Sequence, residues 1–494
     1  MRKVAVRVAA MSLISASAFA IPYASHIRVS STDLAPGVGA DIRYVLNESA
    51  DSVTIEIVPS GGGAAVATTT FNSPDLETTS GSHIVAWDGT DTFAAGTDIP
   101  DGTYRVQITV DNSVAAGWTE FSSNRSVAAI GEATTLETLF SGFSPKDTLI
   151  HLNPDNDLFG LILAASTLGA PQHTGHVPLL SDLNTLGGGD GLADLVLNNP
   201  GGYLGNQGVW GSVVDPISDE FVWATGQNST AVNFMNADTS GGIPTDLLDA
   251  DPSDFLLGQF PRSIAIFADG GARTALLTGG EGVMLSVAIT STPPFTASAA
   301  FGQIMSLMTT TRYSKDVEVD DAGNIYWASR RESSAAETGG RLYRWDFATV
   351  QAAIANPVGA PLTDANASWI VDVPVASTSV NGITIDRNGD VFLQVASDGI
   401  YNVANVSVAS LTTTLGAGQL AVDFTAIGAG FVPSPFGSSV TADAVGNLYT
   451  VDSDSQQIRA FSPGGTTSET FPAPLSQTLT ITTTTAVGDW SLYR

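Results

Sequence analysis

The side chains that most often carry out chemistry are scarce in this sequence. Cysteine is absent, and the only histidines are His26, His83, His151, His173 and His176. His173 and His176 lie three residues apart in PQHTGHVP, a spacing at which two histidines can bind zinc. Proline and glycine around the pair predict a loop, and no third ligand lies nearby, so we expect a polar surface loop. The G-x-S-x-G motif is also absent, which argues against a serine hydrolase of that design.

The densest group of basic residues lies between positions 330 and 344. It comprises Arg330, Arg331, Arg341 and Arg344. Guanidinium groups can clamp a carboxylate or a sulfate through paired hydrogen bonds. Local pairing with Glu332 and Glu337 also accounts for the group, and we prefer that interpretation.

The chain is strongly acidic. Its 494 residues include 49 Asp and Glu against 19 Lys and Arg, which gives a net charge of −30. Binding to nucleic acid requires clustered Lys and Arg that neutralise phosphates. We therefore expect no nucleic-acid partner and no docking on anionic lipid.

The first 20 residues have the three parts of a secretory signal peptide. MRKVAVR is a basic head, a short apolar stretch follows, and Ala18-Phe19-Ala20 is a small-x-small end. The apolar stretch is too short to span a bilayer, and no later segment could do so. We expect a signal peptide over 1–20, cleavage after Ala20 and no membrane span in the mature chain. An exported chain without cysteine has no disulfide framework. We expect a bacterial protein that is secreted, periplasmic or located at the cell surface.

Residues 21–120 contain a series of short strands. Apolar and polar residues alternate in the segments 42–46, 52–58, 81–87 and 102–110. Glycine-containing segments between them predict turns. Strands of this length and spacing predict a β-sandwich of about 90 residues.

Three runs of this domain resemble the immunoglobulin-like (Ig-like) domain of the flagellar hook-capping (FlgD-like) family. They are IRYVLNESADSVTIEIV, GSHIVAWDGTD and IPDGTYRVQITV, and the resemblance covers residues 40–112. It rests on Trp87-Asp88-Gly89 and on the run 100–104, PDGTY. It implies structural roles for these residues, with Trp87 capping the core. Such domains also occur as accessory modules in exported bacterial proteins, so no flagellar function is implied.

A strand–turn–strand pattern recurs in the rest of the chain. It is clearest in VEVDDAGNIYWAS, ITIDRNGDVFLQV and VTADAVGNLYTVD, where Asp320, Asp386 and Asp443 are followed three residues later by Gly and six later by an aromatic residue. An Asp can hydrogen-bond its own backbone in such a turn, and Gly tolerates a positive φ. Weaker copies occur around Phe159, Phe221 and Arg273, so the copies are 52 to 66 residues apart.

Several copies are followed by a further strand, and three or four short strands per period are typical of a β-propeller blade. A blade buries both faces only in a closed ring. The predicted fold is therefore all-β: an N-terminal Ig-like β-sandwich (21–120), a linker (121–134) and a six-bladed β-propeller (135–494). A β-helix or a string of sandwiches is the alternative. Ring closure needs a strand from one terminus, and we expect 136–140 or 490–493 to supply it.

The last copies resemble NHL-type and gluconolactonase-like propellers. NGITIDRNGDVFL and VTADAVGNLYTVDSDSQQIRAF carry the resemblance, which fades upstream. Gluconolactonase-like enzymes hold a divalent metal in the central funnel with Glu, Asn and Asp, and Asn381 stands where that family has its metal-binding Asn. No Glu or Asp can be matched, and Asn381-Gly382 is also an ordinary turn.

A second metal candidate lies in GGGDGLADLVLNNPGG, residues 187–202. DGLADLVL resembles the calcium loop of FG-GAP repeats in integrin-like propellers, which hold calcium with alternating acidic oxygens. Asp190 and Asp194 match the last two acidic positions, while Leu186 and Gly188 replace the first two. A calcium ion (Ca2+) would need another oxygen, such as one from Asp182.

Three functions are compatible with these observations. We predict an exported, non-catalytic binding or scaffolding protein whose propeller face recognises an extracellular ligand, which is a protein, a peptide or a glycan. The first alternative is a metal-dependent, lactonase-like hydrolase or lyase acting at the funnel. The second is a structural component of a surface layer or filament. Asp190, Asp194 and Asn381 are the candidate metal ligands, and no catalytic residue is assigned.

Overall fold

The structure, a computed structural model, describes most of the chain. The described residues are 21–114, 116–124, 145–166, 175–183, 209–226, 231–236, 245–249, 262–279, 283–291, 295–296, 302–306, 312–331, 340–372, 380–395, 399–404, 423–427, 439–452 and 457–483. Within them the fold is all-β, as the sequence predicts. The exceptions are the helix α2 (Phe347–Ala355) and the 3-10 turns η1 (Leu76–Thr78), η3 (Asp364–Asn366) and η4 (Leu475–Gln477). None of the described helices has the length and apolar character needed to cross a membrane.

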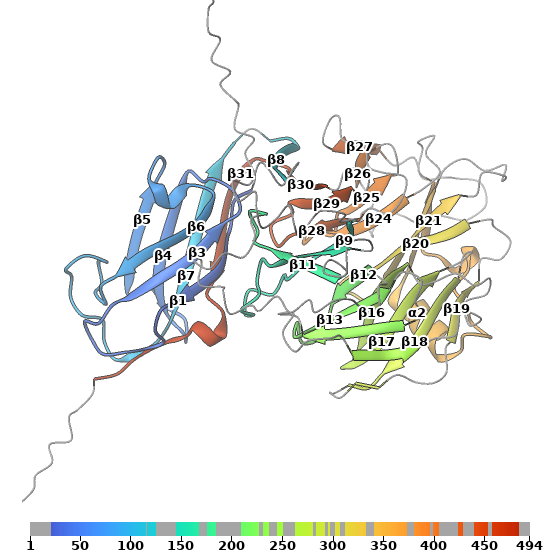
Figure 1. Ribbon diagram of the computed structural model, residues 1–494, viewed down its shortest axis with the longest axis horizontal. Coiled ribbons are helices and arrows are strands. Elements are labelled where there is room, and N and C mark those ends of the chain that lie inside the picture. Colours follow the sequence, from blue (N-terminus) through green and yellow to red (C-terminus); the bar gives the residue numbers. More distant parts are fainter. Residues whose placement is uncertain are drawn as a thin grey trace, which may run out of the picture.

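The N-terminal domain is a sandwich of two sheets, seen on the left of Figure 1. One sheet has the order β1 (Ala24–Val29), β3 (Ala40–Leu46), β6 (Gly81–Trp87). The other has the order β2 (Asp33–Leu34), β32 (Leu479–Ile481), β7 (Gly102–Ser113), β4 (Ser52–Pro59), β5 (Ala67–Asn72). The four strands expected from the alternation are therefore present as β3, β4, β6 and β7.

Alternation along these strands builds the core of the sandwich. In β4, Val53, Ile55 and Ile57 are fully buried, while the residues between them are partly exposed. Successive side chains of a strand point to opposite faces, so one face of the sheet is apolar. Trp87 is buried against this core, as expected, and its Nε1 donates to the carbonyl oxygen of Thr90 at 2.8 Å.

Residues from the far end of the chain complete the sandwich. β31 (Thr466–Pro472) and β32 both pair antiparallel with β7. The predicted propeller comprises residues 135–494, whereas the structure places β31 and β32 of that range in the sandwich. The physical reason is that TTSETFP carries no repeat motif, and only the free edge of β7 decides which sheet it joins.

In the described ranges, six antiparallel sheets follow the sandwich, each built from strands that are consecutive in the chain apart from one exchange. The first three are β9 (Pro145–Ile150), β10 (Ile162–Ser166), β11 (Gly175–Leu179); β12 (Val209–Val214), β13 (Phe221–Gly226), β14 (Ala231–Asn236), β15 (Thr245–Asp249); and β16 (Ser263–Asp269), β17 (Ala272–Gly279), β18 (Val283–Ile289), β19 (Gly302–Ser306). The others are β20 (Arg312–Val319), β21 (Ile325–Arg331), β22 (Arg341–Trp345), β23 (Trp369–Asp372); β24 (Val380–Ile385), β25 (Val391–Val395), β26 (Gly399–Ala404), β27 (Asp423–Ile427); and β28 (Val440–Ala442), β29 (Leu448–Asp452), β30 (Gln457–Ser462), β8 (Thr119–Asn124).

The first strands of these sheets contact one another in a ring. β9 lies next to β12, β12 next to β16, and so on through β20 and β24 to β28, which returns to β9. Figure 1 shows the sheets arranged around this ring, with β8, β30, β28 and β11 on the side that faces the sandwich. The sheets therefore form a propeller-like ring.

The last sheet is completed by a strand from the opposite end of the chain. β8 pairs with β30 from Asn124 opposite Ile458 to Thr119 opposite Ser462. The two segments that we expected to close the ring, 136–140 and 490–493, lie outside the described residues. The strand that completes this sheet comes instead from the junction between the expected sandwich and linker.

Candidate functional site

The repeated Asp–Gly turns have the same geometry in the three clearest copies. The Oδ1 atoms of Asp320, Asp386 and Asp443 each accept backbone N–H groups from two and four residues later, at 2.8–3.0 Å. The glycine three residues after each Asp has a φ between 77° and 92°. Both features were predicted from the sequence. The turns join the first and second strands of their sheets, so they lie together at one end of the ring.

A cavity of about 850 Å³ runs along the inside of the ring and reaches these turns. Its walls are side chains of all six inner strands, β9, β12, β16, β20, β24 and β28. Phe471 of β31, a sandwich strand, also lines it. The cavity therefore opens where the two domains meet, which is a common location for ligand sites.

Three carboxyl groups line this cavity and interact electrostatically. Asp147 lies on β9, and Asp316 and Glu318 lie on β20. Burial, together with the neighbouring Asp316, raises the pKa of Asp147 to about 7. Burial raises the pKa of Asp316 to about 6, although hydrogen bonds from Ser263 and two backbone N–H groups oppose the shift. Burial and both aspartates raise the pKa of Glu318 well above its ordinary value.

The two aspartates are part of a belt of hydrogen bonds between inner strands. Asp147 Oδ2 accepts from the Ser212 N–H at 2.6 Å, and Asp316 Oδ2 accepts from the Ile383 N–H at 2.7 Å. Three further bonds have the same role: Ser263 Oγ to Asp316 Oδ1 at 2.7 Å, Ala442 N–H to Thr384 Oγ1 at 3.1 Å and Thr148 N–H to Ser439 Oγ at 2.9 Å. The belt thus joins neighbouring inner strands at five junctions and stabilises the ring.

The mouth of the cavity is rich in carboxyl groups. The acidic lining residues are Asp147, Asp219, Asp316, Glu318, Asp320, Asp321, Asp386 and Asp443. The basic residue in the lining is Arg387, whose guanidinium pairs with Glu469 of β31 at 2.8 Å. The carboxyl groups of the turns at the mouth, Asp320, Asp321 and Asp386, therefore provide a field that favours positively charged groups.

A second polar cluster is buried between the sandwich and the first and last sheets of the ring. His26, His151 and His176 are each at most 5% exposed, and the proximity of His151 contributes to the lowered pKa of the other two. Burial lowers the pKa of His26 and of His176 to about 3, so both are neutral at pH 7. Ser25 Oγ bridges His26 Nδ1 and Ser181 Oγ, each at 2.9 Å. Ser25 of the sandwich and Ser181 beside the first sheet meet in this cluster, so it belongs to the domain interface.

The predicted site residues do not converge in the described part of the chain. Asp190, Asp194 and His173 lie outside the described residues. Asn381 is 6% exposed at the start of β24 and is not part of the cavity lining. Within the described ranges, no three His, Asp or Glu side chains are placed to hold a metal ion together.

One local expectation needs correction. His176 is not on a polar surface loop: it is buried in β11, where Gly175–Leu179 pairs with β10. Just beyond this segment, Ser181 Oγ contacts Ser25 Oγ of the sandwich at 2.9 Å, a contact that the local proline and glycine residues do not reveal. Arg344 donates to Tyr326 Oη at 3.2 Å and to Asp346 Oδ1 at 2.5 Å. Glu332 and Glu337, the expected partners of the basic group, lie outside the described residues, so that prediction stays a prediction.

The sequence contains a pattern that indicates two of the cavity carboxyl groups. Asp316 and Glu318 are two residues apart on the first strand of a repeat copy. Residues at this spacing share one face of a strand. In a ring of sheets, the first strand of each copy faces the axis, so both carboxyl groups point into the cavity.

Comparison with known proteins identifies one segment of the chain. Residues 31–113 match the family model of the FlgD Ig-like domain, which confirms the resemblance stated for residues 40–112. No curated protein matches the chain.

Several solved structures are similar to parts of the chain at low sequence identity. The holo PQQ domain of a pyranose dehydrogenase from Coprinopsis cinerea has 11% identity and a TM-score of 0.43, covering 66% of this chain and 94% of that one. A chain of a nidogen/laminin complex has 15% identity and a TM-score of 0.34, covering 56% and 84%. A luciferin-regenerating enzyme has 10% identity and a TM-score of 0.33, covering 54% and 76%. Because these TM-scores are all below 0.5, the description of the ring rests on the sheets and contacts of this chain itself.

Proposed function

We propose that this chain is an exported bacterial binding or scaffolding protein without catalytic activity. In this proposal the six sheets are the blades of a six-bladed β-propeller, and the Ig-like sandwich holds the propeller in a fixed orientation. The observation that supports it most directly is the exchange of strands, because β8 leaves the sandwich segment for the ring while β31 and β32 return to the sandwich. Domains that share strands cannot turn freely, which suits presentation of a recognition surface.

The cavity mouth is the proposed binding site, and a cationic protein segment or peptide is the proposed ligand. Eight carboxyl groups line the cavity, and its one lining guanidinium is paired with Glu469. Such a field steers positive ligands toward the mouth and disfavours acidic ones. Phe471 adds an apolar surface from the sandwich, so a bound segment would contact both domains.

Two observations favour binding over metal-dependent hydrolysis. Both carboxylate oxygens of Asp147 and of Asp316 accept hydrogen bonds, three of them from the belt and one from the adjacent Thr148 N–H. These hydrogen bonds orient the oxygens toward neighbouring strands of the ring, whereas a metal ligand needs a remaining lone pair directed at the ion. Asn381, the candidate ligand of a lactonase-like site, lies outside the cavity lining.

A titration of a Lys-rich peptide tests the proposed site. Asp321→Lys changes an exposed carboxyl group at the mouth, and Asp33→Lys makes the same change on an exposed strand of the sandwich. We expect Asp321→Lys to weaken binding several-fold more than Asp33→Lys, at matched ionic strength. Equal effects of the two variants would show that only the overall charge attracts the peptide.

Elemental mass spectrometry with lactone and ester hydrolysis assays tests the alternative function. A stoichiometric divalent ion whose removal abolishes hydrolysis would replace the binding proposal with the lactonase-like one. A calcium ion whose removal lowers the melting temperature without abolishing any hydrolysis would support a structural site. Asp190 and Asp194 are the candidate ligands of such a site. Self-assembly to high mass without ligand would favour the surface-layer or filament alternative.

A further inference from the structure

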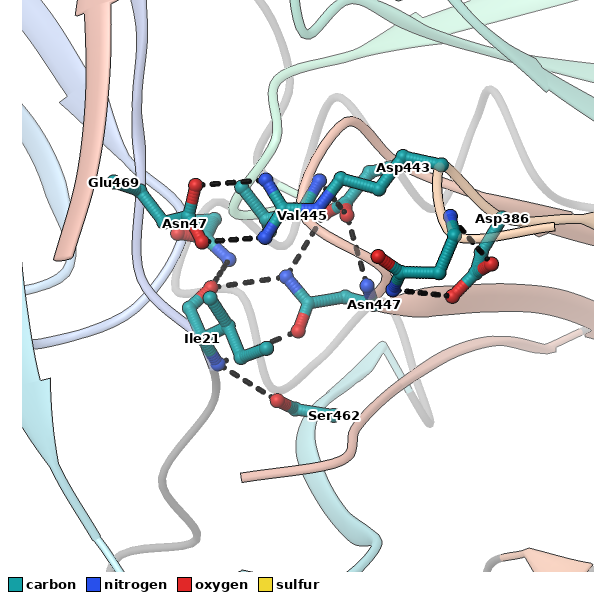
Figure 2. Close-up of polar contacts among 10 residues, drawn as sticks. Ile21, Asn47, Asp386, Asp443, Val445, Asn447, Ser462 and Glu469 are labelled. Atoms are coloured by element: carbon teal, nitrogen blue, oxygen red, sulfur yellow. Dashed lines mark hydrogen bonds and ion pairs between the residues drawn. The ribbon is translucent and has the colours of Figure 1, made fainter. Parts of the chain in front are cut away.

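Ile21 lies between the sandwich and the ring, and both domains hold its main chain (Figure 2). Asn447 of the ring donates from Nδ2 to the Ile21 carbonyl oxygen at 3.0 Å and accepts at Oδ1 from the Ile21 nitrogen at 3.3 Å. Asn47 of the sandwich donates to the same carbonyl oxygen at 3.2 Å. Ser462 Oγ accepts from the Ile21 nitrogen at 2.7 Å. Ile21 is thus fixed from both sides.

The Ile21 side chain is anchored as firmly as its main chain. It is 6% exposed and packs in one apolar cluster with Tyr23, Phe159 and Val445, which come from three separate parts of the chain. Phe471 packs against the same cluster. A residue at the end of a domain is poorly ordered unless such contacts hold it.

The acceptors around the Ile21 nitrogen outnumber the hydrogens of a peptide group. A peptide nitrogen carries one hydrogen, which here must be shared between Ser462 Oγ and Asn447 Oδ1. An α-ammonium group carries three and can give each oxygen its own hydrogen bond. Both acceptor residues are fully buried, so water does not compete for them.

A negative group lies next to this pocket. Asn447 Nδ2 also donates to Asp443 Oδ2 at 2.9 Å, so one side chain connects the Ile21 main chain to a buried carboxyl group. Burial raises the pKa of Asp443 to about 7, although hydrogen bonds from Asn447 and nearby backbone N–H groups oppose the shift. A nearby positive charge favours the ionised carboxylate, and that carboxylate in turn offsets the cost of burying the positive charge.

We propose that Asn447 and Ser462 form a binding site for the free α-ammonium group of Ile21, which locks the sandwich onto the ring after the leader is removed. The group arises when water hydrolyses the Ala20–Ile21 peptide bond. The hydroxyl goes to the Ala20 carbonyl carbon and the proton to the Ile21 nitrogen, so that Ala20 leaves as a carboxylate and Ile21 is protonated. This inference rests on the export part of the proposed function and is independent of what the cavity binds.

Amine labelling of the exported, processed protein tests the site directly. A chain that begins at Ile21 has three amines, its α-amine and those of Lys146 and Lys315, so mass spectrometry can resolve each one. We expect the α-amine of the folded protein to be acylated at least about tenfold more slowly than that of the urea-unfolded protein. Equal rates would overturn the proposed site while leaving ligand binding untouched. A mature N-terminus at another residue would overturn both the inference and the predicted cleavage site.

Extension of the N-terminus provides a second test. A chain beginning Gly-Ser-Ile21 keeps every side chain but moves the ammonium group away from the pocket. We expect the chain that begins at Ile21 to melt about 2 °C or more above the extended chain near pH 6.5. Binding of the ammonium form raises its pKa above the ordinary value of about 8, so this advantage is present below about pH 8 and is lost as pH rises through the folded-state pKa.

Matched serine variants locate the effect. Ser462→Ala removes an acceptor of the Ile21 nitrogen and should reduce the advantage of the unextended chain. Ser468→Ala, at an exposed position of β31, should leave it unchanged. Equal melting of the extended and unextended chains near pH 6.5, or an advantage that grows at high pH, would contradict the proposal.

Discussion

Arg273 and Asp215 form a buried ion pair that joins the second and third sheets of the ring. Arg273 Nε donates to Asp215 Oδ1 at 2.8 Å, and Nη2 donates to Oδ2 at 2.6 Å. The side chains are 4% and 0% exposed. Burial alone would raise the pKa of Asp215, but hydrogen bonds from Arg273 and Ser218 leave it below its ordinary value. Arg273 occupies the position at which other repeat copies have an aromatic residue, so an ion pair replaces a ring there.

Removal of this arginine is expected to destabilise the ring strongly. Arg273→Met leaves the Asp215 carboxylate buried without its partner, which costs about 3–5 kcal/mol. Arg387→Met is the matched control, because its pair with Glu469 is 42% exposed on the arginine side and should cost about 1 kcal/mol or less. Urea denaturation of the two variants measures both free energies of unfolding. Similar losses in the two variants would contradict a special role for the buried pair.

The glycines of the repeated turn are expected to differ in their tolerance of alanine. At Gly389, where φ is 81° and no atom would touch a new Cβ, alanine costs the backbone strain alone, roughly 1–2 kcal/mol. At Gly323, φ is 77° and the new Cβ would lie 2.5 Å from Phe347 Cδ2, so the loss should be larger. Gly61→Ala, with no close atom and no positive φ, is the control and should be nearly neutral. Thermal melting of the three variants should follow this order.

Stability is expected to fall with rising pH because of Asp147. A carboxyl group whose pKa is raised to about 7 in the folded state stabilises fully below its unfolded value of about 4, and this contribution is lost as pH rises through 7. Asp147→Asn removes the titration but weakens the hydrogen bonds to Ser212 and Thr148, so it lowers stability at pH 5. Between about pH 5 and about pH 8, the wild type should lose stability relative to Asp147→Asn. The free energy of unfolding of Asp33→Asn, a change on the sandwich surface, should vary with pH in parallel with that of the wild type. The same parallel variation for Asp147→Asn would refute this assignment.

The sandwich is expected to depend on the C-terminal strands. A fragment of residues 21–114 exposes the edge of β7 that β31 and β32 normally cover, and free edges of this kind promote aggregation. We expect this fragment to be unfolded or aggregated, and a fusion that adds residues 463–483 to restore a cooperative melting transition. Circular dichroism and size-exclusion chromatography of the two fragments provide the comparison. A stable, monomeric 21–114 fragment would show that the exchanged strands are dispensable.

The sequence by itself determined the local structure of this protein. Alternation in β4 and β7 depends on side chains two residues apart, and the turns at Asp320, Asp386 and Asp443 depend on contacts within five residues. Such interactions involve only near neighbours in the chain, so the pattern carries them. The Ig-like sandwich was recognisable for the same reason, because its motif lies in consecutive segments.

The tertiary structure alone decided which distant segments meet. Nothing local in TTSETFP indicates that it pairs with β7, and nothing in PQHTGHVP indicates that His176 is buried beneath the sandwich. The pairing of Arg273 with Asp215, 58 residues apart, and of Ile21 with Ser462, 441 apart, depends on ring closure and on the docking of two domains. Contacts of this kind form when the edges and apolar faces of sheets are covered in three dimensions. The pattern of neighbouring residues in the sequence does not contain that information.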